Sequence, residues 1–297
     1  MVSHLAQYLK MIKFSHSIFA LPFAGIALIE ALKISNIQDQ PLISILLLIF
    51  KVILCMVFLR SAAMGFNRIV DKKYDAANPR TKDREVASGQ ISLRNAWTFV
   101  ILFLILFFIT ALLINPMTGI LSPFAAFFVL FYSFTKRFTY FCHFVLGFAI
   151  GLAPLAAWVA VLGTIESWIP FLWSAGLMFY IAGFDILYAC QDIDFDKKSG
   201  LYSIPANLGA STALITAKIS HGLSILAFIA AGILSSSGWI YYISLLIVSG
   251  LFIAEHKMVR YDDFSKIPIA FFNVNASISS ILFFGLLLDT FFHFGVY

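Results

Sequence analysis

The feature that most constrains this chain is a series of apolar stretches, each about 20 residues long. A helix of that length crosses the hydrocarbon core of a lipid bilayer. Hydrophobic residues make up 61% of the 297 positions and charged residues 12%, so one soluble core could not bury the apolar surface. We therefore predict an all-α integral membrane protein, a single bundle in contact with membrane lipid. The nine predicted transmembrane helices cover residues 14–33, 42–64, 96–114, 117–135, 140–162, 168–190, 211–233, 236–255 and 267–292.

Basic residues are distributed unevenly between the two sides of this predicted bundle. Of the 20 Lys and Arg residues, all but Lys33, Lys51, Arg60 and Lys218 fall in segments on one side. Because positively charged loops stay in the cytoplasm, the N-terminus is predicted to be cytoplasmic and the C-terminus external. The formal net charge of +5 is then explained by this bias, and we expect no nucleic-acid partner.

Two long polar loops, roughly residues 65–95 and 191–210, follow the second and the sixth predicted spans. Both would lie on the cytoplasmic side, at points four helices apart. That spacing indicates a weak internal repeat, with halves at about 1–138 and 139–297 within one domain, 1–297. Repeats of this kind commonly build a site between the two halves of a bundle.

The first polar loop begins with a regular series of polar side chains. Asn67, Asp71 and Asp75 follow one another at intervals of four residues. A helix that continues from the second span would place all three on one face.

The second polar loop carries a similar stripe. Asp185, Tyr188, Asp192 and Asp196 lie at positions i, i+3, i+7 and i+11, which share one face of a helix, whereas Asp194 points elsewhere. Asp185 lies at the membrane end of the sixth span, where a carboxylate without a partner is costly. Two regularly spaced motifs at equivalent loops favour a site over two solvated loop ends.

Carboxylates stacked on one face repel one another unless a cation lies among them. Oxygen ligands without Cys or His suit Mg²⁺, which keeps several waters and bridges to substrate phosphates. Two opposed faces could clamp a diphosphate through Mg²⁺ held by Asn67, Asp71, Asp75, Asp192 and Asp196. The basic residues that could take the remaining phosphate charge are Lys72, Lys73, Arg80, Arg84, Lys136, Arg137, Lys197 and Lys198.

Both motifs resemble those of the UbiA family of membrane-embedded prenyltransferases, and the resemblance covers almost the whole chain. The first resembles the family's Asn-xxx-Asp-xxx-Asp, with the continuation Arg80-Thr81-x-x-Arg84-x-x-x-x-Gly89. The second resembles Asp-xx-Tyr-Ala-xx-Asp, at Asp185, Tyr188, Ala189 and Asp192, with the tail Gly200-x-x-Ser203. The segments Phe131 to Arg137 and Gly147 to Trp158 resemble the 4-hydroxybenzoate branch of the family.

The resemblance implies a bundle around a central cavity that is open laterally to lipid. It implies that a polyprenyl diphosphate binds through Mg²⁺, that its allylic C–O bond ionises, and that the prenyl group alkylates an acceptor. For this branch the acceptor is 4-hydroxybenzoate, prenylated ortho to its hydroxyl on the route to ubiquinone. The expected location is the bacterial inner membrane, with the site facing the cytoplasm. The residues expected to be catalytic are Asp71, Asp75, Asp192 and Asp196, and those expected to bind substrate are Asn67, Arg80, Arg84, Lys136, Arg137, Asp185, Tyr188 and Arg60.

Two arginines could bind the carboxylate of the acceptor. Arg60 lies within the second span, seven residues before Asn67 and on roughly the same face. It could instead be a structural counter-ion of the aspartates. Arg137 is the second candidate, and Lys136 could hold phosphate, although both could be plain cytoplasmic anchors.

Other functions remain open from the sequence. Asn78-Pro79 and the segment Lys13 to Pro22 depart from the commonest 4-hydroxybenzoate enzymes and are similar to UbiA-like members thought to act in the futalosine route to menaquinone. The acceptor could therefore be a menaquinone intermediate. A cation-coupled transporter is an alternative of a different class, but its site would lie near the midplane. The sequence does not set the oligomeric state.

Overall fold

The computed structural model describes residues 2–12, 20–35, 40–259, 267 and 273–294. Within these residues every regular element is helical, which confirms the predicted all-α class. The elements are α1 (Val2–Met11), α2 (Leu21–Ile34), α3 (Leu42–Val70), α4 (Lys72–Ala77), α5 (Leu93–Leu112), α6 (Pro116–Thr135), α7 (Cys142–Leu162), α8 (Ile169–Ala189), η3 (Cys190–Asp192), α9 (Ile193–Lys198), α10 (Ile204–Leu208), α11 (Ala210–Leu234), α12 (Trp239–Met258) and α14 (Asn275–Phe294).

Eight helices in the described part of the chain are long and apolar enough to cross a membrane. They contain α3, α5, α6, α7, α8, α11, α12 and α14 and match the predicted spans from the second onward. The first predicted span corresponds to α2, but residues 14–19 of that span lie outside the described residues, as does most of Lys13 to Pro22. The count of nine spans and the cytoplasmic N-terminus therefore stay predictions.

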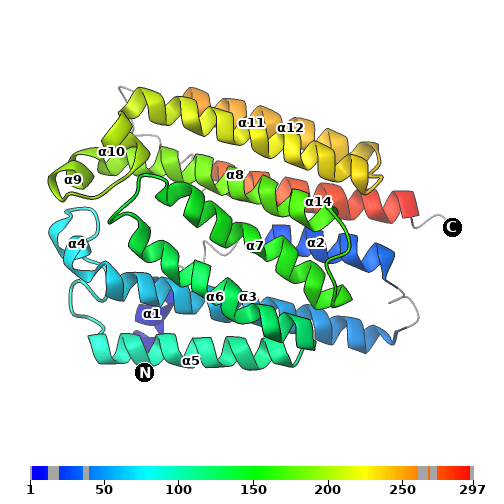
Figure 1. The fold of residues 1–297 in the computed structure, drawn as a ribbon, viewed down its shortest axis with the longest axis horizontal. Coiled ribbons are helices and arrows are strands. Elements are labelled where there is room, and N and C mark those ends of the chain that lie inside the picture. Colours follow the sequence, from blue (N-terminus) through cyan, green and yellow to red (C-terminus); the bar gives the residue numbers. More distant parts are fainter. Residues whose placement is uncertain (1, 13–19, 36–39, 260–266, 268–272, 295–297) are drawn as a thin grey trace.

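The long helices run side by side, and the short helices α4, α9 and α10 gather at one end of the bundle (Figure 1). Helix α8 packs closely against both α7 and α11. Large aromatic side chains fill this region, and Trp158, Trp173, Tyr180 and Phe228 are all buried there. Many large apolar side chains, such as Leu46, face outward instead, as expected for a surface that contacts lipid. The packing brings the two polar loops to the same end of the molecule.

Two glycines one turn apart allow the close approach of α7 and α8. A Cβ atom at Gly147 would collide with the carbonyl oxygen of Met178, and one at Gly151 would collide with that of Ser174. Both obstacles are backbone atoms, which cannot move aside as a side-chain tip can. The Gly-xxx-Gly spacing therefore has a packing role, as in many membrane helix pairs.

Gly147→Ala is expected to destabilise the fold by about 1–3 kcal/mol, because the added methyl group forces α7 away from α8. Thermal unfolding in detergent would show a lower melting temperature. Gly222→Ala on α11 is the matched control, since a Cβ there meets nothing within 4 Å and alanine favours the helix. Equal melting temperatures for Gly147→Ala and the unmodified protein would contradict this account.

Candidate functional site

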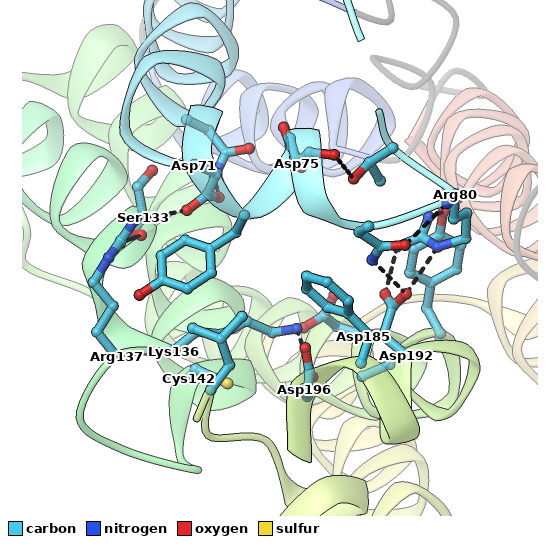
Figure 2. A pocket seen from close by; sticks show the side chains of 18 of the residues that line it. Asp71, Asp75, Arg80, Ser133, Lys136, Arg137, Cys142, Asp185, Asp192 and Asp196 are labelled. Atoms are coloured by element: carbon cyan, nitrogen blue, oxygen red, sulfur yellow. Dashed lines mark hydrogen bonds and ion pairs between the residues drawn. The ribbon is translucent and has the colours of Figure 1, made fainter. Parts of the chain in front are cut away.

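A cavity of about 160 Å³ opens at the end of the bundle where α4 and α9 face each other. Side chains of the two acidic motifs enter it from opposite sides (Figure 2). Most of the predicted site residues line it, namely Asn67, Asp71, Asp75, Arg80, Arg84, Lys136, Arg137, Asp185, Tyr188, Asp192 and Asp196. Arg60 and the lysines predicted to take phosphate charge, Lys72, Lys73, Lys197 and Lys198, do not line it.

The first motif lies on a helix that is interrupted only at Asp71. Helix α3 ends at Val70 and α4 begins at Lys72, yet the backbone hydrogen-bond pattern continues across the junction. The amide nitrogen of Asp71 donates to the Asn67 carbonyl at 2.9 Å, and that of Asp75 donates to the Asp71 carbonyl at 2.8 Å. The Asn67 side-chain amide also donates to Asp71 Oδ2 at 2.7 Å. The three side chains thus share one face.

The second motif begins on α8 and ends on α9. A short 3₁₀ turn, Cys190–Asp192, joins the two helices without removing Asp192 or Asp196 from the cavity. Asp194, the acidic residue predicted to point elsewhere, is exposed and does not line the cavity.

Four of the aspartates form ion pairs with Arg or Lys side chains. The distances from nitrogen to oxygen are between 2.7 and 3.1 Å for three of these pairs. The pairs are Asp71 with Arg137, Asp75 with Arg84, Asp192 with Arg80, and Asp196 with Lys136. Each carboxylate is therefore held in place by a cation that could instead bind a phosphate.

Arg80 connects the two motifs. Its Nε donates to Asp192 Oδ1 at 3.0 Å, its Nη2 donates to Asp192 Oδ2, and its Nη1 donates to the Tyr188 hydroxyl at 2.8 Å. Burial lowers the pKa of Arg80, but the hydrogen bonds and charges of Asp192 and Tyr188 outweigh this effect and raise it overall. The guanidinium therefore stays charged.

Asn78 is a site residue that the sequence analysis treated only as a departure from the family pattern. Its Nδ2 donates to Asp192 Oδ1 at 3.3 Å, and its Oδ1 accepts from the backbone nitrogen of Arg80 at 2.9 Å. It thus fixes the loop that carries Arg80. Its place just before Pro79 gave no indication of a partner 114 positions away.

The acidic side of the cavity could accept a further cation. Burial raises the pKa of Asp71; Arg137 opposes this shift, whereas the neighbouring Asp75 adds to it. Oδ2 of Asp75 is buried without a hydrogen-bond partner. An uncompensated buried carboxylate oxygen is expected where a cation binds.

The donor set fits Mg²⁺ better than a transition metal. All five predicted ligands offer oxygen, and Mg²⁺ is usually bound by one or two carboxylates together with water and substrate phosphates. Within the described residues, no three His, Cys, Asp or Glu side chains converge enough to hold a metal ion by themselves. A bound diphosphate would supply further oxygen ligands.

Further lining residues were missed because single sequence positions carry no sign of tertiary contact. Tyr74 lies within the first motif, and Tyr132 and Ser133 lie in the segment that resembles the 4-hydroxybenzoate branch. Their position beside predicted site residues in the sequence could have identified them as candidates. The other cavity residues that were missed as candidates are Asn78, Thr81, Cys142, Ala189, Phe195 and Leu201.

Arg60 lies deeper in the membrane part of α3 and does not line the cavity. Its Nε is buried without a hydrogen-bond partner. Arg137, by contrast, donates to the Ser133 and Val70 carbonyls and to Asp71, at distances of 2.6 to 3.0 Å. Of the two arginines considered for the acceptor, Arg60 is the one with a buried donor that lacks a partner.

Comparison with known proteins identifies one family. The model of the UbiA prenyltransferase family matches residues 21–281. The 4-hydroxybenzoate octaprenyltransferase of Escherichia fergusonii is 32% identical over 238 residues, which is 80% of each chain. The enzyme of the same name from Klebsiella pneumoniae subsp. pneumoniae is 33% identical over 234 residues, which cover 78% of this chain and 79% of that one.

Solved structures share the fold. The apo structure of a UbiA homolog from Aeropyrum pernix K1 has 31% sequence identity and a TM-score of 0.81, over 93% of this chain and 98% of that one. A UbiA homolog from Archaeoglobus fulgidus, bound to GPP and Mg²⁺, has 20% identity and a TM-score of 0.64, over 95% and 99% of the two chains. The second similarity is one of fold alone.

Proposed function

Because this chain belongs to the UbiA prenyltransferase family, we propose that it transfers a polyprenyl group from a polyprenyl diphosphate to 4-hydroxybenzoate, ortho to the hydroxyl, in ubiquinone biosynthesis. The observation that carries the proposal is the convergence of two aspartate motifs on one cavity rimmed by four cations, Arg80, Arg84, Lys136 and Arg137. The relatives named 4-hydroxybenzoate octaprenyltransferase support this choice of acceptor.

The cavity residues would bind the diphosphate and stabilise it as a leaving group. When the allylic C–O bond breaks, its electron pair remains on the diphosphate, and the four cations can neutralise that charge. Asn67, Asp71, Asp75, Asp192 and Asp196 would hold Mg²⁺, which supplies further neutralisation of the diphosphate. The GPP and Mg²⁺ bound to the Archaeoglobus fulgidus homolog support both ligands.

The position of the cavity suits a substrate with a polar head and a lipid tail. It lies at one end of the bundle, where the basic loops gather, while apolar helices extend away from it. A polyprenyl tail could follow these helices into the membrane. By the positive-inside rule the site faces the cytoplasm, and the membrane would be the bacterial inner membrane.

Arg60 would bind the carboxylate of the aromatic acid. Seven residues place it two helical turns from Asn67, about 10 Å deeper along α3. A carboxylate held there would leave the aromatic ring between Arg60 and the diphosphate. Its buried, unpartnered Nε is the donor that such an anion would satisfy.

Arg60→Leu is therefore expected to raise the KM for the acceptor by about tenfold or more, because a charged hydrogen bond is lost. The KM for geranyl diphosphate should change by less than about twofold, since Arg60 does not line the diphosphate cavity. Arg60→Lys keeps the charge and serves as the control. If Arg60 is instead a counter-ion of the aspartates, both KM values would rise together.

The experiment for the proposed function uses the purified protein in detergent. It is incubated with geranyl diphosphate, Mg²⁺ and radiolabelled 4-hydroxybenzoate, and product is measured in a lipid extract. We expect a labelled prenylated acid. A second incubation with a dihydroxynaphthoate tests the menaquinone alternative, which the position of Asn78 in the site keeps open. Absence of product from 4-hydroxybenzoate would contradict the proposal, and product from the dihydroxynaphthoate alone would favour the menaquinone alternative.

A further inference from the structure

One aspartate in the cavity forms no ion pair with an arginine or lysine among the residues that the structure describes. Asp71, Asp75, Asp192 and Asp196 each form an ion pair with a cation, whereas the partner of Asp185 among the described residues is His143. A cation in direct contact makes a carboxylate a weaker proton acceptor. Among the described residues, Asp185 is thus the cavity aspartate whose carboxylate is not held by an arginine or a lysine.

The contacts of His143 indicate which of its ring nitrogens carries the donated proton. The imidazole is fully buried at the start of α7. Its Nε2 lies 3.3 Å from the backbone nitrogen of Ile204, which is a donor, so Nε2 must be an acceptor without a proton. The proton then lies on Nδ1, which is 2.7 Å from Asp185 Oδ2 and donates to it. Oδ2 of Asp185 therefore accepts the hydrogen bond from Nδ1 of His143.

Three parts of the chain meet at this histidine. Helix α7 supplies His143, α8 supplies Asp185, and Ile204 stands at the first turn of α10, where a backbone N–H has no partner within its own helix. Asp185 is still partly exposed to the cavity, with 23% of its side chain accessible. The Asp185 side chain can therefore meet a substrate in the cavity.

We propose that His143 is a positioning residue that holds Asp185 as the proton acceptor of the transfer reaction. The inference rests on the proposed function. A bond forms between the ring carbon of the acceptor and the allylic carbon, the C–O bond to the diphosphate breaks, and the ring hydrogen leaves as a proton. Asp185 accepts that proton, while the Nδ1–H of His143 keeps its carboxylate oriented.

The test compares His143→Leu with His143→Gln in the full-length protein, using geranyl diphosphate, Mg²⁺ and 4-hydroxybenzoate. Glutamine can donate to Asp185 and accept from Ile204 without exchanging protons, whereas leucine can do neither. We expect leucine to lower kcat by about 100-fold and glutamine to restore most of that loss. Equal losses in both variants, or full activity in His143→Leu, would overturn the proposal.

Ring-deuterated 4-hydroxybenzoate gives a readout that a merely structural role would not change. In His143→Leu the loss of the ring proton becomes slower, so a primary isotope effect on kcat should exceed that of the unmodified protein. An equal isotope effect in the two proteins overturns the proposal. Where the leucine variant does not fold, Asp185→Asn replaces it, and full activity of that variant overturns the proposal.

These experiments distinguish a failure of the proposed function from a failure of the role proposed for His143. If the unmodified protein forms no product from 4-hydroxybenzoate, the proposed function is contradicted. If the unmodified protein is active and His143→Leu is equally active, only the role of His143 is contradicted.

Discussion

Asp192→Ala is expected to lower turnover by about 1,000-fold, as removal of a central group that stabilises charge in the transition state does. The substitution removes an oxygen that would hold Mg²⁺. It also removes the partner of Asn78 and the carboxylate partner of Arg80, so the loop carrying Arg80 loses its hydrogen bonds to the 3₁₀ turn η3 and keeps only the one from Arg80 to Tyr188. A single change thus disturbs both motifs at once.

Steady-state turnover with geranyl diphosphate and 4-hydroxybenzoate measures this effect. Asp194→Ala is the matched control, because Asp194 lies two residues away, is exposed and does not line the cavity. It should stay within about twofold of the unmodified protein. Both variants should elute from a sizing column as the unmodified protein does. Retention of more than about a tenth of the activity by Asp192→Ala would contradict the assigned role.

Removal of divalent cations with EDTA is expected to abolish turnover, and added Mg²⁺ is expected to restore it. The reason is the acidic face of the cavity, in which Asp75 Oδ2 is buried without a hydrogen-bond partner and burial raises the pKa of Asp71. Without a metal ion, these carboxylates would repel a diphosphate brought near them.

The measurement is a titration of activity against free Mg²⁺ in EDTA buffers. Ca²⁺ serves as the control, because it prefers longer bonds and more ligands than Mg²⁺ and should support less activity. Turnover that persists at full strength in EDTA would contradict the predicted metal requirement.

The helices were predictable because hydropathy reports which segments cross a membrane, but it does not report where a helix ends. The second predicted span stops at residue 64, whereas α3 continues to Val70 because its polar last turns remain hydrogen-bonded. Conversely, α5 begins at Leu93, before the predicted residue 96, because the Ser92 side chain accepts from Asn95 and caps the helix there.

The site was predictable to the extent that it follows the period of a helix. Asn67, Asp71 and Asp75 share a face because of their spacing alone. Partners between helices depend on tertiary packing, and spacing carries no such information. The pair formed by Arg80 and Asp192 spans 112 positions, and His143 bonds to Asp185 across 42 positions.

The ion pairs couple the binding of the metal ion to the binding of the diphosphate. In the substrate-free cavity, four carboxylates and four cations compensate one another. A diphosphate that takes the cations leaves the carboxylates free for metal, and a metal that takes the carboxylates leaves the cations free for diphosphate. Each ligand must therefore strengthen the other's binding by the same factor, since thermodynamic linkage is reciprocal. The cavity thereby favours the complete metal–diphosphate complex over either ligand alone.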